Sequence, residues 1–312
     1  MRDRELLASE VASQAAAHQP YGGVVPEVAS RHHLQHAPRL LARAIEHAGI
    51  SLGEVDAFAA TSGPGLASSL MIGASLAKGL ALGFGKPYLA INHLEGHLLS
   101  PFFASAGGIE PNVALIVSGG HTLLVEVNGV GDYRIIGRTV DDAAGEAFDK
   151  VARMLGLGYP GGPEVERCAA GGDKARFDLP RSMLHSGDAN FSFSGLKTAV
   201  RYLLPKIAPE DQRDLCASFQ RAVVDVLVAK TVTAARAARG KLVTVSGGVS
   251  CNGELRAQMS LGCEPAGLEL RFAEPRFCTD NAAMIAFAAM LRLERGEATS
   301  LTTEINPNLA LV

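Results

Sequence analysis

The chain is poor in cysteine and has no paired cysteine motif. Its 312 residues include five cysteines, at 168, 216, 251, 263 and 278, and none of them form a CxxC pair. An odd number without such pairs excludes a disulfide framework and a zinc ribbon, and favours a reducing cytoplasm. The N-terminus lacks an apolar signal core, and the weakly charged stretch 64–77 is too short to cross a bilayer before Lys78 ends it. We therefore expect a cytoplasmic protein without a membrane span.

Long runs of one charge are also absent. Lysine and arginine total 29, aspartate and glutamate total 32, and the formal net charge is −3. This balance excludes a polybasic tail, although it leaves room for a local basic patch. Glycine, in contrast, is abundant, with 34 residues against a usual share of ~7%. The length suggests about two domains, since roughly 150 residues make one.

The glycines gather where apolar segments end. A short apolar run leads into a glycine turn in three places, at 56–65, 113–120 and 241–248. Between these runs lie stretches with apolar residues at helical spacing. These expected helices are 30–48, 66–82, 141–155, 209–239 and 281–295. Alternating strands and helices predict an α/β architecture, and the lack of a low-complexity linker favours two lobes over separate domains.

The three glycine turns have two interpretations. A strand that ends in Ser-Gly-Gly lets the backbone approach a phosphate or ribose, because glycine has no Cβ and its exposed N–H groups form an anion nest. Three such turns favour a nucleotide-like ligand. The alternative is that they are ordinary turns between strands and helices, which glycine suits in any case.

The segment Asn92-His93-Leu94-Glu95-Gly96-His97 is a candidate metal site. Two histidines at i and i+4 share one helix face and can reach a single ion, although such pairs also occur on ordinary surfaces. Zinc proteases need glutamate directly after the first histidine, where this chain has Leu94. At about 100° per residue, a helical Glu95 points away from the face shared by His93 and His97. A protease is therefore disfavoured.

Carboxylates provide further candidates with open alternatives. Asp142, Glu146 and Asp149 have the spacing of one helix face and could bind ribose hydroxyls, or they could form a solvated helix start in which Glu146 pairs with Lys150. Asp280 precedes a predicted helix, where a carboxylate is commonly a cap. It could also be the oxygen ligand that the two histidines lack.

Eight segments occur in the order found in one protein family. The chain resembles the tRNA N6-adenosine threonylcarbamoyltransferases (TsaD/Gcp type), and the likeness runs from about residue 11 to residue 309. The matching segments are YGGVVPEVASR (21–31), NHLEGH (92–97), VSGGHT (117–122), DDAAGEAFDK (141–150), YPGGPE (159–164), FSFSGLKT (191–198), SGGVSCN (246–252) and CTDNAAM (278–284).

The resemblance implies an actin-like (ASKHA) two-lobed α/β fold with central mixed sheets flanked by helices. We expect a first lobe at 1–110, a second lobe at 111–285 with an inserted helical segment, and a C-terminal helix and tail at 286–312 that return to the first lobe. The implied reaction transfers a threonylcarbamoyl group from threonylcarbamoyl-adenylate to N6 of the adenosine 3′ of the anticodon, in tRNAs that read codons beginning with A.

The resemblance also assigns site residues. It implies that His93, His97 and Asp280 bind one divalent metal, Fe²⁺ or alternatively Zn²⁺, at a cleft that holds the nucleotide. His121 is a candidate proton carrier, with a packing or supporting role as the alternative. The implied adenylate-binding residues are Ile116, Val117, Ser118, Gly119, Gly120, Asp149, Gly162 and Asn252.

Partners are implied by the resemblance as well: a tRNA substrate, ATP, and TsaB-like and TsaE-like proteins. Basic residues that could contact tRNA phosphates, or simply form a solvated surface, lie on two predicted helices. They are Lys197, Arg201, Arg221, Lys230, Arg236 and Arg239.

The chain departs from the family pattern at its start. Family members begin with a hairpin that carries a phosphate loop, and residues 1–18 instead resemble the third strand of the family and the residues after that strand. We therefore expect a first lobe without its opening strands, with an exposed sheet edge. The alternative functions are a catalytically impaired short form or a non-catalytic partner subunit; sugar kinases of the same fold would not need NHLEGH together with Asp280.

Overall fold

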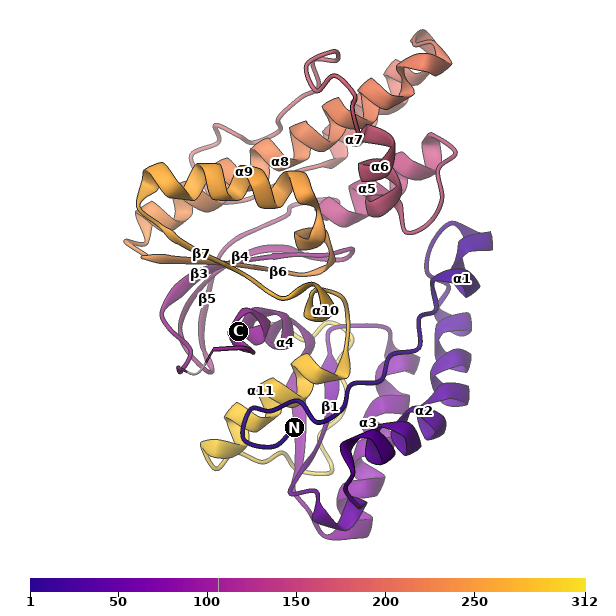
Figure 1. The fold of residues 1–312 in the computed structure, drawn as a ribbon, viewed down its shortest axis with the longest axis vertical. Helices are drawn as coiled ribbons and strands as arrows, with labels where there is room; N and C mark the ends of the chain where they lie inside the picture. Colours follow the sequence, from indigo (N-terminus) through magenta and orange to yellow (C-terminus); the bar gives the residue numbers. More distant parts are fainter. Residues whose placement is uncertain (106) are drawn as a thin grey trace. The chain divides into compact units, whose positions relative to one another are not determined.

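The computed structural model describes residues 1–105 and 107–312 and divides into two compact units. The first unit combines Met1–Ala106 with Asp280–Val312, and the second comprises Gly107–Thr279. Figure 1 follows the chain from the first unit into the second and back. The lobe limits expected from the sequence, 1–110, 111–285 and 286–312, differ from the bounds of these units and remain a proposal.

The first unit is built on a short parallel sheet. Strands β1 (Phe58–Gly63) and β2 (Tyr88–Asn92) pair in parallel, with Phe58 opposite Tyr88, and α3 (Ala67–Phe84) connects them. Buried side chains of β1, β2 and α3 form the core of this βαβ unit. The remaining helices of this unit are α1 (Ala15–His18), α2 (Pro26–Ala48), α4 (His93–Leu99) and α11 (Ala282–Glu294), with short 3-10 turns between them.

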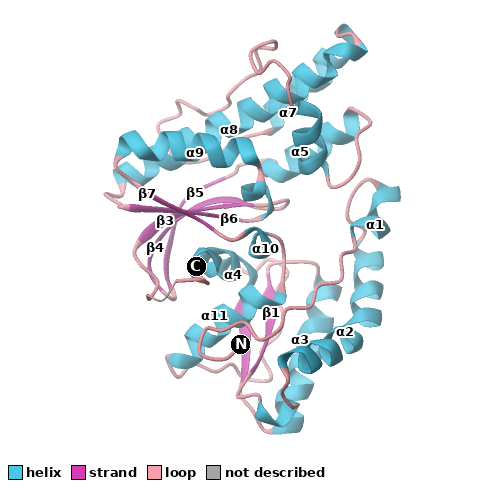
Figure 2. Cartoon of the chain, in the orientation of Figure 1, coloured by secondary structure: helices cyan, strands magenta, loops and turns pink. Residues whose placement is uncertain are grey.

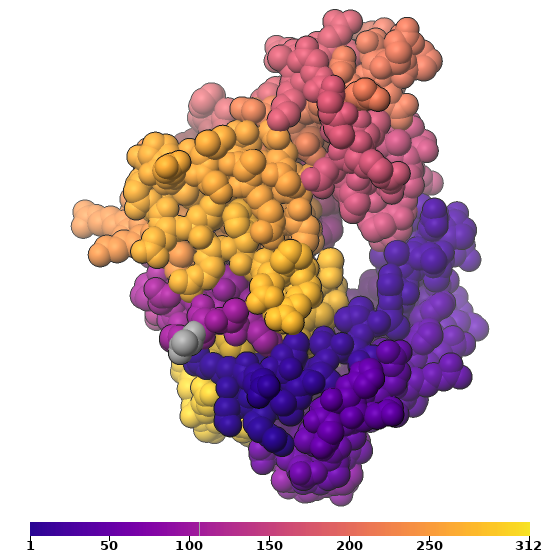
Figure 3. Space-filling model, in the orientation of Figure 1, coloured from indigo at the N-terminus to yellow at the C-terminus, as the bar shows by residue number. Residues whose placement is uncertain are grey.

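The N-terminal segment does not form the expected strand. Residues 1–14 contain no strand beyond an isolated bridge between Arg2 and Glu5. Figure 3 shows this segment, in indigo, on the surface of the first unit. A β-strand needs a hydrogen-bonding neighbour, and the pairs described for the sheet of this unit join β1 and β2 only. The prediction that these residues form a strand, made from their likeness to the family, was therefore wrong.

The first glycine turn is covered by the chain's own C-terminal residues. Asn306 N donates to Ser62 O at 2.8 Å, and Gly65 N donates to Pro307 O at 3.1 Å. A Cβ added to Gly63 would lie 1.9 Å from Asn306 O, and the φ of Gly63 is +150°. Only glycine fits this close approach. The glycines of this turn therefore have a structural explanation.

Helix α3 has the length and composition of a membrane span. Among the residues that the structure describes, it is the one helix that passes this test, with a mean hydropathy of 1.3. Lys78 lies within it, and its ammonium donates to the carbonyl of Thr303 and lies 5.6 Å from the centre of the Tyr88 ring. The residue that interrupts the apolar stretch thus joins α3 to β2 and to the C-terminal segment.

The second unit contains a mixed five-stranded sheet. Its order is β5-β4-β3-β6-β7; β5, β4 and β3 are antiparallel neighbours, whereas β3, β6 and β7 run parallel. Figure 2 shows α8 and α9 along one face of this sheet. The strands are β3 (Asn112–Val117), β4 (Thr122–Gly129), β5 (Asp132–Arg138), β6 (Leu242–Ser246) and β7 (Glu269–Phe272). The helices are α5 (Ala144–Met154), α6 (Gly161–Ala169), α7 (Ser194–Leu203), α8 (Gln212–Ala237), α9 (Gly253–Cys263) and α10 (Pro275–Cys278).

The five predicted helices are confirmed to within a few residues as α2, α3, α5, α8 and α11. Two local expectations were wrong. The turn at 118–121 joins the antiparallel strands β3 and β4, so it is a hairpin turn and not a connection to a helix. Helix α5 begins at Ala144 and not at Asp141, because both aspartates before it bind partners elsewhere.

Candidate metal centre and glycine-lined turns

Helix α4 presents two histidines on one face. Asn92 caps the helix by accepting a hydrogen bond from Leu94 N at 2.9 Å, which fixes its start directly after β2. The rings of His93 and His97 are one turn apart, with their centroids separated by 4.8 Å. The His93 side chain is 17% exposed and that of His97 is 1% exposed. The pair therefore lies at the edge of the core.

Asp280 completes this group within the same unit. Its Oδ1 lies 3.4 Å from Nε2 of His93 and 3.2 Å from Nε2 of His97, and the three ligand atoms lie within 4.8 Å of one another. Ligands that bind one metal at 2.0–2.2 Å are roughly 3.0–3.4 Å apart in tetrahedral or octahedral geometry. The Asp280 side chain is 77% exposed, which leaves room for a substrate ligand. The two distances to Asp280 match this spacing, and two imidazoles with a carboxylate are a donor set that suits a divalent metal.

The protonation states also suit a metal. Burial lowers the pKa of His97 and outweighs the opposing hydrogen bond to Asp280, so the imidazole is neutral near pH 7. For Asp280, desolvation would raise the pKa, but hydrogen bonds from the two imidazoles outweigh it and lower the pKa. Among the described residues, the buried Nδ1 of His97 has no hydrogen-bond partner. A metal would take the place of the proton through which Nε2 of His97 hydrogen-bonds Asp280, and Nδ1 would then carry the proton of the neutral ring.

Glu95 lies away from this face, as its helical position predicts. Its carboxylate is fully buried and forms an ion pair with Arg292 of α11. It therefore cannot serve as the general base that a zinc protease requires, and the structure agrees with the exclusion made from the sequence.

Two glycines bring three segments of the second unit together at the end of β3. Strands β3 and β6 end side by side, with Ile116 opposite Ser246. Gly247 has a φ of +92°, and a Cβ there would lie 2.3 Å from Val117 O. A Cβ on Gly145, in the first turn of α5, would lie 2.5 Å from the carbonyl oxygen that precedes Gly119. The turn is thus held between α5 and the end of β6.

The predicted ligand turn itself has space around its glycines. A Cβ on Gly119 or Gly120 would meet no atom within 4 Å. The turn is closed by two hydrogen bonds, from Ser118 N to His121 O at 2.8 Å and from His121 N to Ser118 Oγ at 3.2 Å. The structure therefore places His121 at the end of the turn, and its part in proton transfer stays a prediction.

Asp149 and Gly162 lie where α5 meets α6. Asp149 Oδ1 accepts a hydrogen bond from Gly161 N at 2.7 Å, and a Cβ on Gly161 would lie 2.6 Å from the Asp149 Cα. Gly162, in contrast, has nothing within 4 Å of its Cβ position. Burial raises the pKa of Asp149 above its usual value, and the charge of Glu146 adds to this effect, against the Gly161 hydrogen bond. The pair thus forms a second open, glycine-lined position.

Asn252 has a structural role of its own. Its Oδ1 accepts from Leu255 N at 3.0 Å and caps α9, while its Nδ2 donates to Gln220 Oε1 at 2.8 Å. The side chain is buried, so any adenylate contact would use its remaining hydrogen-bonding capacity.

Gly145, Gly161 and Gly247 were not among the site residues predicted from the sequence. Each lies inside one of the eight family-like segments, and each excludes a Cβ by contact with backbone. Their position within these segments was the available signal, but one sequence does not reveal which glycine touches backbone and which faces open space.

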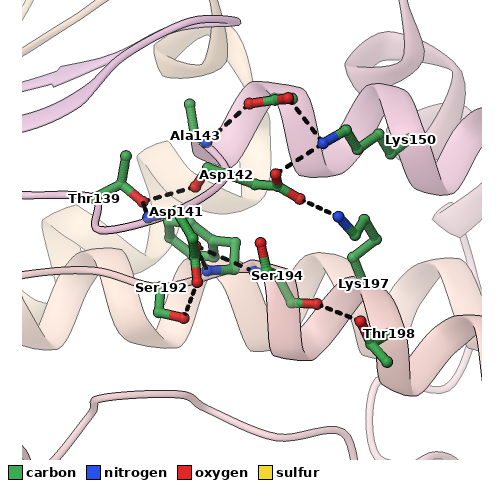
Figure 4. Close-up of polar contacts among 11 residues, drawn as sticks. Thr139, Asp141, Asp142, Ala143, Lys150, Ser192, Ser194, Lys197 and Thr198 are labelled. Atoms are coloured by element: carbon green, nitrogen blue, oxygen red, sulfur yellow. Dashed lines mark hydrogen bonds and ion pairs between the residues drawn. The ribbon is translucent and has the colours of Figure 1, made fainter.

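Asp141 and Asp142 connect two of these segments, as Figure 4 shows. Asp141 Oδ1 accepts from Phe193 N at 2.8 Å and from Ser194 N at 3.3 Å, so it caps α7 from outside the helix. The carboxylate of Asp142 accepts from Lys150 at 2.8 Å and from Lys197 at 2.6 Å.

The prediction that Asp142, Glu146 and Asp149 share one helix face was also wrong. Asp142 precedes α5 and turns toward Lys150 and Lys197. Glu146 pairs with Lys150 at 2.8 Å, which confirms that part of the structural alternative. Asp149 alone remains at the glycine-lined position.

Replacing Asp142 with asparagine is expected to destabilise the second unit by about 1–2 kcal/mol at pH 7. Two charge-assisted hydrogen bonds are lost, and the 40% exposure of Lys150 reduces their value. Burial alone would raise the pKa of Asp142, but the two lysines have the larger effect, and the pKa is lowered overall. The stabilisation is therefore complete above the ordinary pKa of an aspartate and disappears as the pH falls through the lowered pKa. Urea unfolding between pH 7 and pH 2 measures this difference. The exposed Asp178→Asn is the control; a pH-independent difference for Asp142→Asn would contradict the prediction.

Half of the candidate tRNA-contacting residues are engaged within the protein. Lys197 binds Asp142, Arg221 binds Asp225, and the buried Lys230 binds Asp188 at 3.3 Å. Arg201, Arg236 and Arg239 are exposed. These three are the better candidates for a nucleic-acid surface.

Comparison with known proteins gives a family match along most of the chain. Residues 5–287 match the family described as TsaD, tRNA N6-adenosine threonylcarbamoyltransferase. A protein of that name from Polaromonas naphthalenivorans is 51% identical over 294 residues, which cover 93% of this chain and 83% of the relative. Another, from Polaromonas sp., is 48% identical and covers 98% of this chain and 90% of the relative.

The solved structure of T. kodakarensis HypF is similar in fold, with a TM-score of 0.63 and 17% identity over 82% of this chain and 43% of that one. This likeness confirms the actin-like α/β fold expected from the sequence. Together, the family match over most of the chain and the high identity to its members show that the chain belongs to the tRNA N6-adenosine threonylcarbamoyltransferase family.

Proposed function

We propose that this chain transfers the threonylcarbamoyl group from threonylcarbamoyl-adenylate to N6 of the adenosine 3′ of the anticodon, in tRNAs that read codons beginning with A. The new bond joins N6 to the carbamoyl carbon, the bond from that carbon to the AMP phosphate oxygen breaks, and N6 loses one proton. The observation that carries the proposal is the convergence of His93, His97 and Asp280 in a chain of this family.

His93, His97 and Asp280 would hold one divalent metal, Fe²⁺ or alternatively Zn²⁺. Such a metal supplies a Lewis acid with open positions, able to polarise the carbamoyl carbonyl. The part of the three residues is to fix these positions. Asn92 anchors the start of α4, and burial keeps His97 neutral. No side-chain nucleophile is needed, since the adenosine amine attacks.

The second unit would bind the adenylate. The turn would run from Ile116 through Val117 and Ser118 to Gly119 and Gly120. The two glycines at its end offer backbone N–H groups that no Cβ shields, which suits a phosphate. Such donors stabilise the negative charge of the departing AMP.

Asp149, Gly162 and Asn252 would surround the nucleoside part of the same ligand. Asp149 uses Oδ1 to accept from Gly161 N, and its second carboxylate oxygen can accept from ribose hydroxyls. The Cβ position of Gly162 is open, which leaves its backbone accessible. These assignments, like the role of His121 in moving the proton, are part of the proposal.

We propose the cytoplasm as the place of this reaction, because the tRNA substrate and ATP are both available there. TsaB-like and TsaE-like proteins would act with the chain, and ATP would be the source of the adenylate. Arg201, Arg236 and Arg239 are the exposed basic residues proposed to contact tRNA phosphates.

The direct test supplies the purified, metal-loaded chain and its partner proteins with threonylcarbamoyl-adenylate and an unmodified tRNA that reads an A-starting codon. Mass spectrometry of the nucleosides then measures N6-threonylcarbamoyladenosine. We expect product with this tRNA and none with a tRNA whose corresponding adenosine is replaced by guanosine. Absence of product while a characterised family member succeeds under the same conditions would refute the proposal.

A further inference from the structure

One ion pair of the first unit lies behind the candidate metal centre and outside the proposed chemistry. Arg292 Nε donates to Glu95 Oε2 at 2.9 Å, and its second terminal nitrogen donates to Glu95 Oε1 at 3.0 Å. Two parallel bonds between a guanidinium and a carboxylate fix both distance and orientation. The Glu95 side chain is 0% exposed and that of Arg292 is 30% exposed, so the carboxylate is shielded from water and salt screens the pair less than it screens a surface pair.

The pair joins the two elements that supply the metal ligands. Glu95 lies on α4, between His93 and His97, and Arg292 lies in the last turn of α11. Asp280 comes two residues before the first residue of α11. Glu95 therefore ties the histidine-bearing helix to the far end of the helix that comes after the carboxylate ligand.

Gly96 provides a second contact between the same helices. A Cβ at Gly96 would lie 2.9 Å from Ile285 Cδ1 and 3.1 Å from Met284 Cγ, both in the first turns of α11. The two helices therefore pack closely at this point, which only glycine allows without displacement. A single close contact leaves rotation about it free.

The ion pair removes that freedom. Arg292 is twelve positions after Asp280, and at 1.5 Å per residue the helical part from residue 282 to Arg292 extends over roughly 15 Å. Contacts at Met284 and at Arg292 thus hold α4 at two separated points along α11. A rotation of α4 that moved His93 and His97 away from Asp280 would have to break the bonds between Glu95 and Arg292.

We infer that Glu95 and Arg292 are a positioning pair, which sets the geometry of the His93, His97 and Asp280 metal site by locking α4 to α11. The inference rests on the proposed metal site. It also explains the order of the motif: the two histidines bind, Glu95 locks the helix and Gly96 lets it approach.

The test measures metal binding on the full chain, with Co²⁺ as the probe, by calorimetry and by visible absorption, which reports coordination geometry. Glu95→Gln keeps the side-chain volume and removes the charge. We expect it to weaken Co²⁺ binding 10–100-fold, as loss of residues that orient metal ligands does, and to alter the absorption bands.

Glu297→Gln is the matched control, because Glu297 accepts from the same guanidinium, at 3.0 Å from Arg292, and is not a residue of α4. We expect it to keep Co²⁺ affinity within about twofold of wild type. Arg292→Lys keeps the positive charge but cannot form the two parallel hydrogen bonds to Glu95, so we expect a loss of Co²⁺ affinity between those of the other two variants. It carries the test if Glu95→Gln does not fold.

Two outcomes separate this inference from the proposed function. Wild type that binds Co²⁺ no better than His93→Ala would refute the metal site and the pair together. Wild-type affinity and unchanged bands in folded Glu95→Gln or Arg292→Lys, with His93-dependent binding intact, would overturn the positioning pair alone.

Discussion

Replacing His93 with alanine is expected to reduce formation of N6-threonylcarbamoyladenosine at least ~100-fold. Under the proposed function His93 would be one of three protein ligands, and without it the metal that would polarise the carbamoyl carbonyl would not be held in place. His93 is 17% exposed and lies at the edge of the core, so its replacement leaves little cavity. The assay is the tRNA reaction under single-turnover conditions, with metal content measured in parallel.

The control is His185→Ala, an exposed histidine of the loop between α6 and α7. It should leave both activity and metal content unchanged. A chelator should inactivate wild type to the level of His93→Ala, and added Fe²⁺ or Zn²⁺ should restore wild type only. Full activity of a metal-free His93→Ala protein would show that the three residues do not support the reaction.

Much of this site could be predicted from the sequence, because local spacing determines it. His93 and His97 share a face whenever residues 93–97 are helical, and the direction of Glu95 is set by the same periodicity. The alternation of apolar runs and glycine turns likewise predicted the α/β fold.

The other features of the fold and the site depend on tertiary contacts, and the pattern of one sequence does not reveal which residues make them. Nothing near Glu95 in the sequence points to Arg292, nearly 200 residues later, and the capping of α7 by Asp141 comes from outside that helix. The conformation of residues 1–14 depends on whether a neighbouring strand is available. Such contacts are decided by packing, which periodicity does not encode.

The second large effect is expected at Gly247, at the end of β6. Gly247→Val should destabilise the second unit by about 2–6 kcal/mol, since a positive φ is strained for a β-branched residue and the Cβ would overlap a carbonyl. The φ is +92°, and the Cβ would lie 2.3 Å from Val117 O. Thermal and urea unfolding followed by circular dichroism measure this loss. A variant as stable as wild type would show that the turns are not held together as the structure describes.

Gly119→Ala separates this structural role from ligand binding. A Cβ at Gly119 meets no protein atom within 4 Å, so the variant should unfold like wild type. If the backbone of this turn cradles the adenylate phosphate, however, the added methyl group occupies the space of the ligand. The KM for threonylcarbamoyl-adenylate should then rise roughly 5–150-fold, as overpacking by about 1–3 kcal/mol predicts. Substitution of the two glycines thus has different expected effects. At Gly247, where backbone atoms surround the Cβ position, the protein loses stability; at Gly119, where the ligand would occupy the open space, it loses affinity. Unchanged KM in Gly119→Ala would place the phosphate away from this turn.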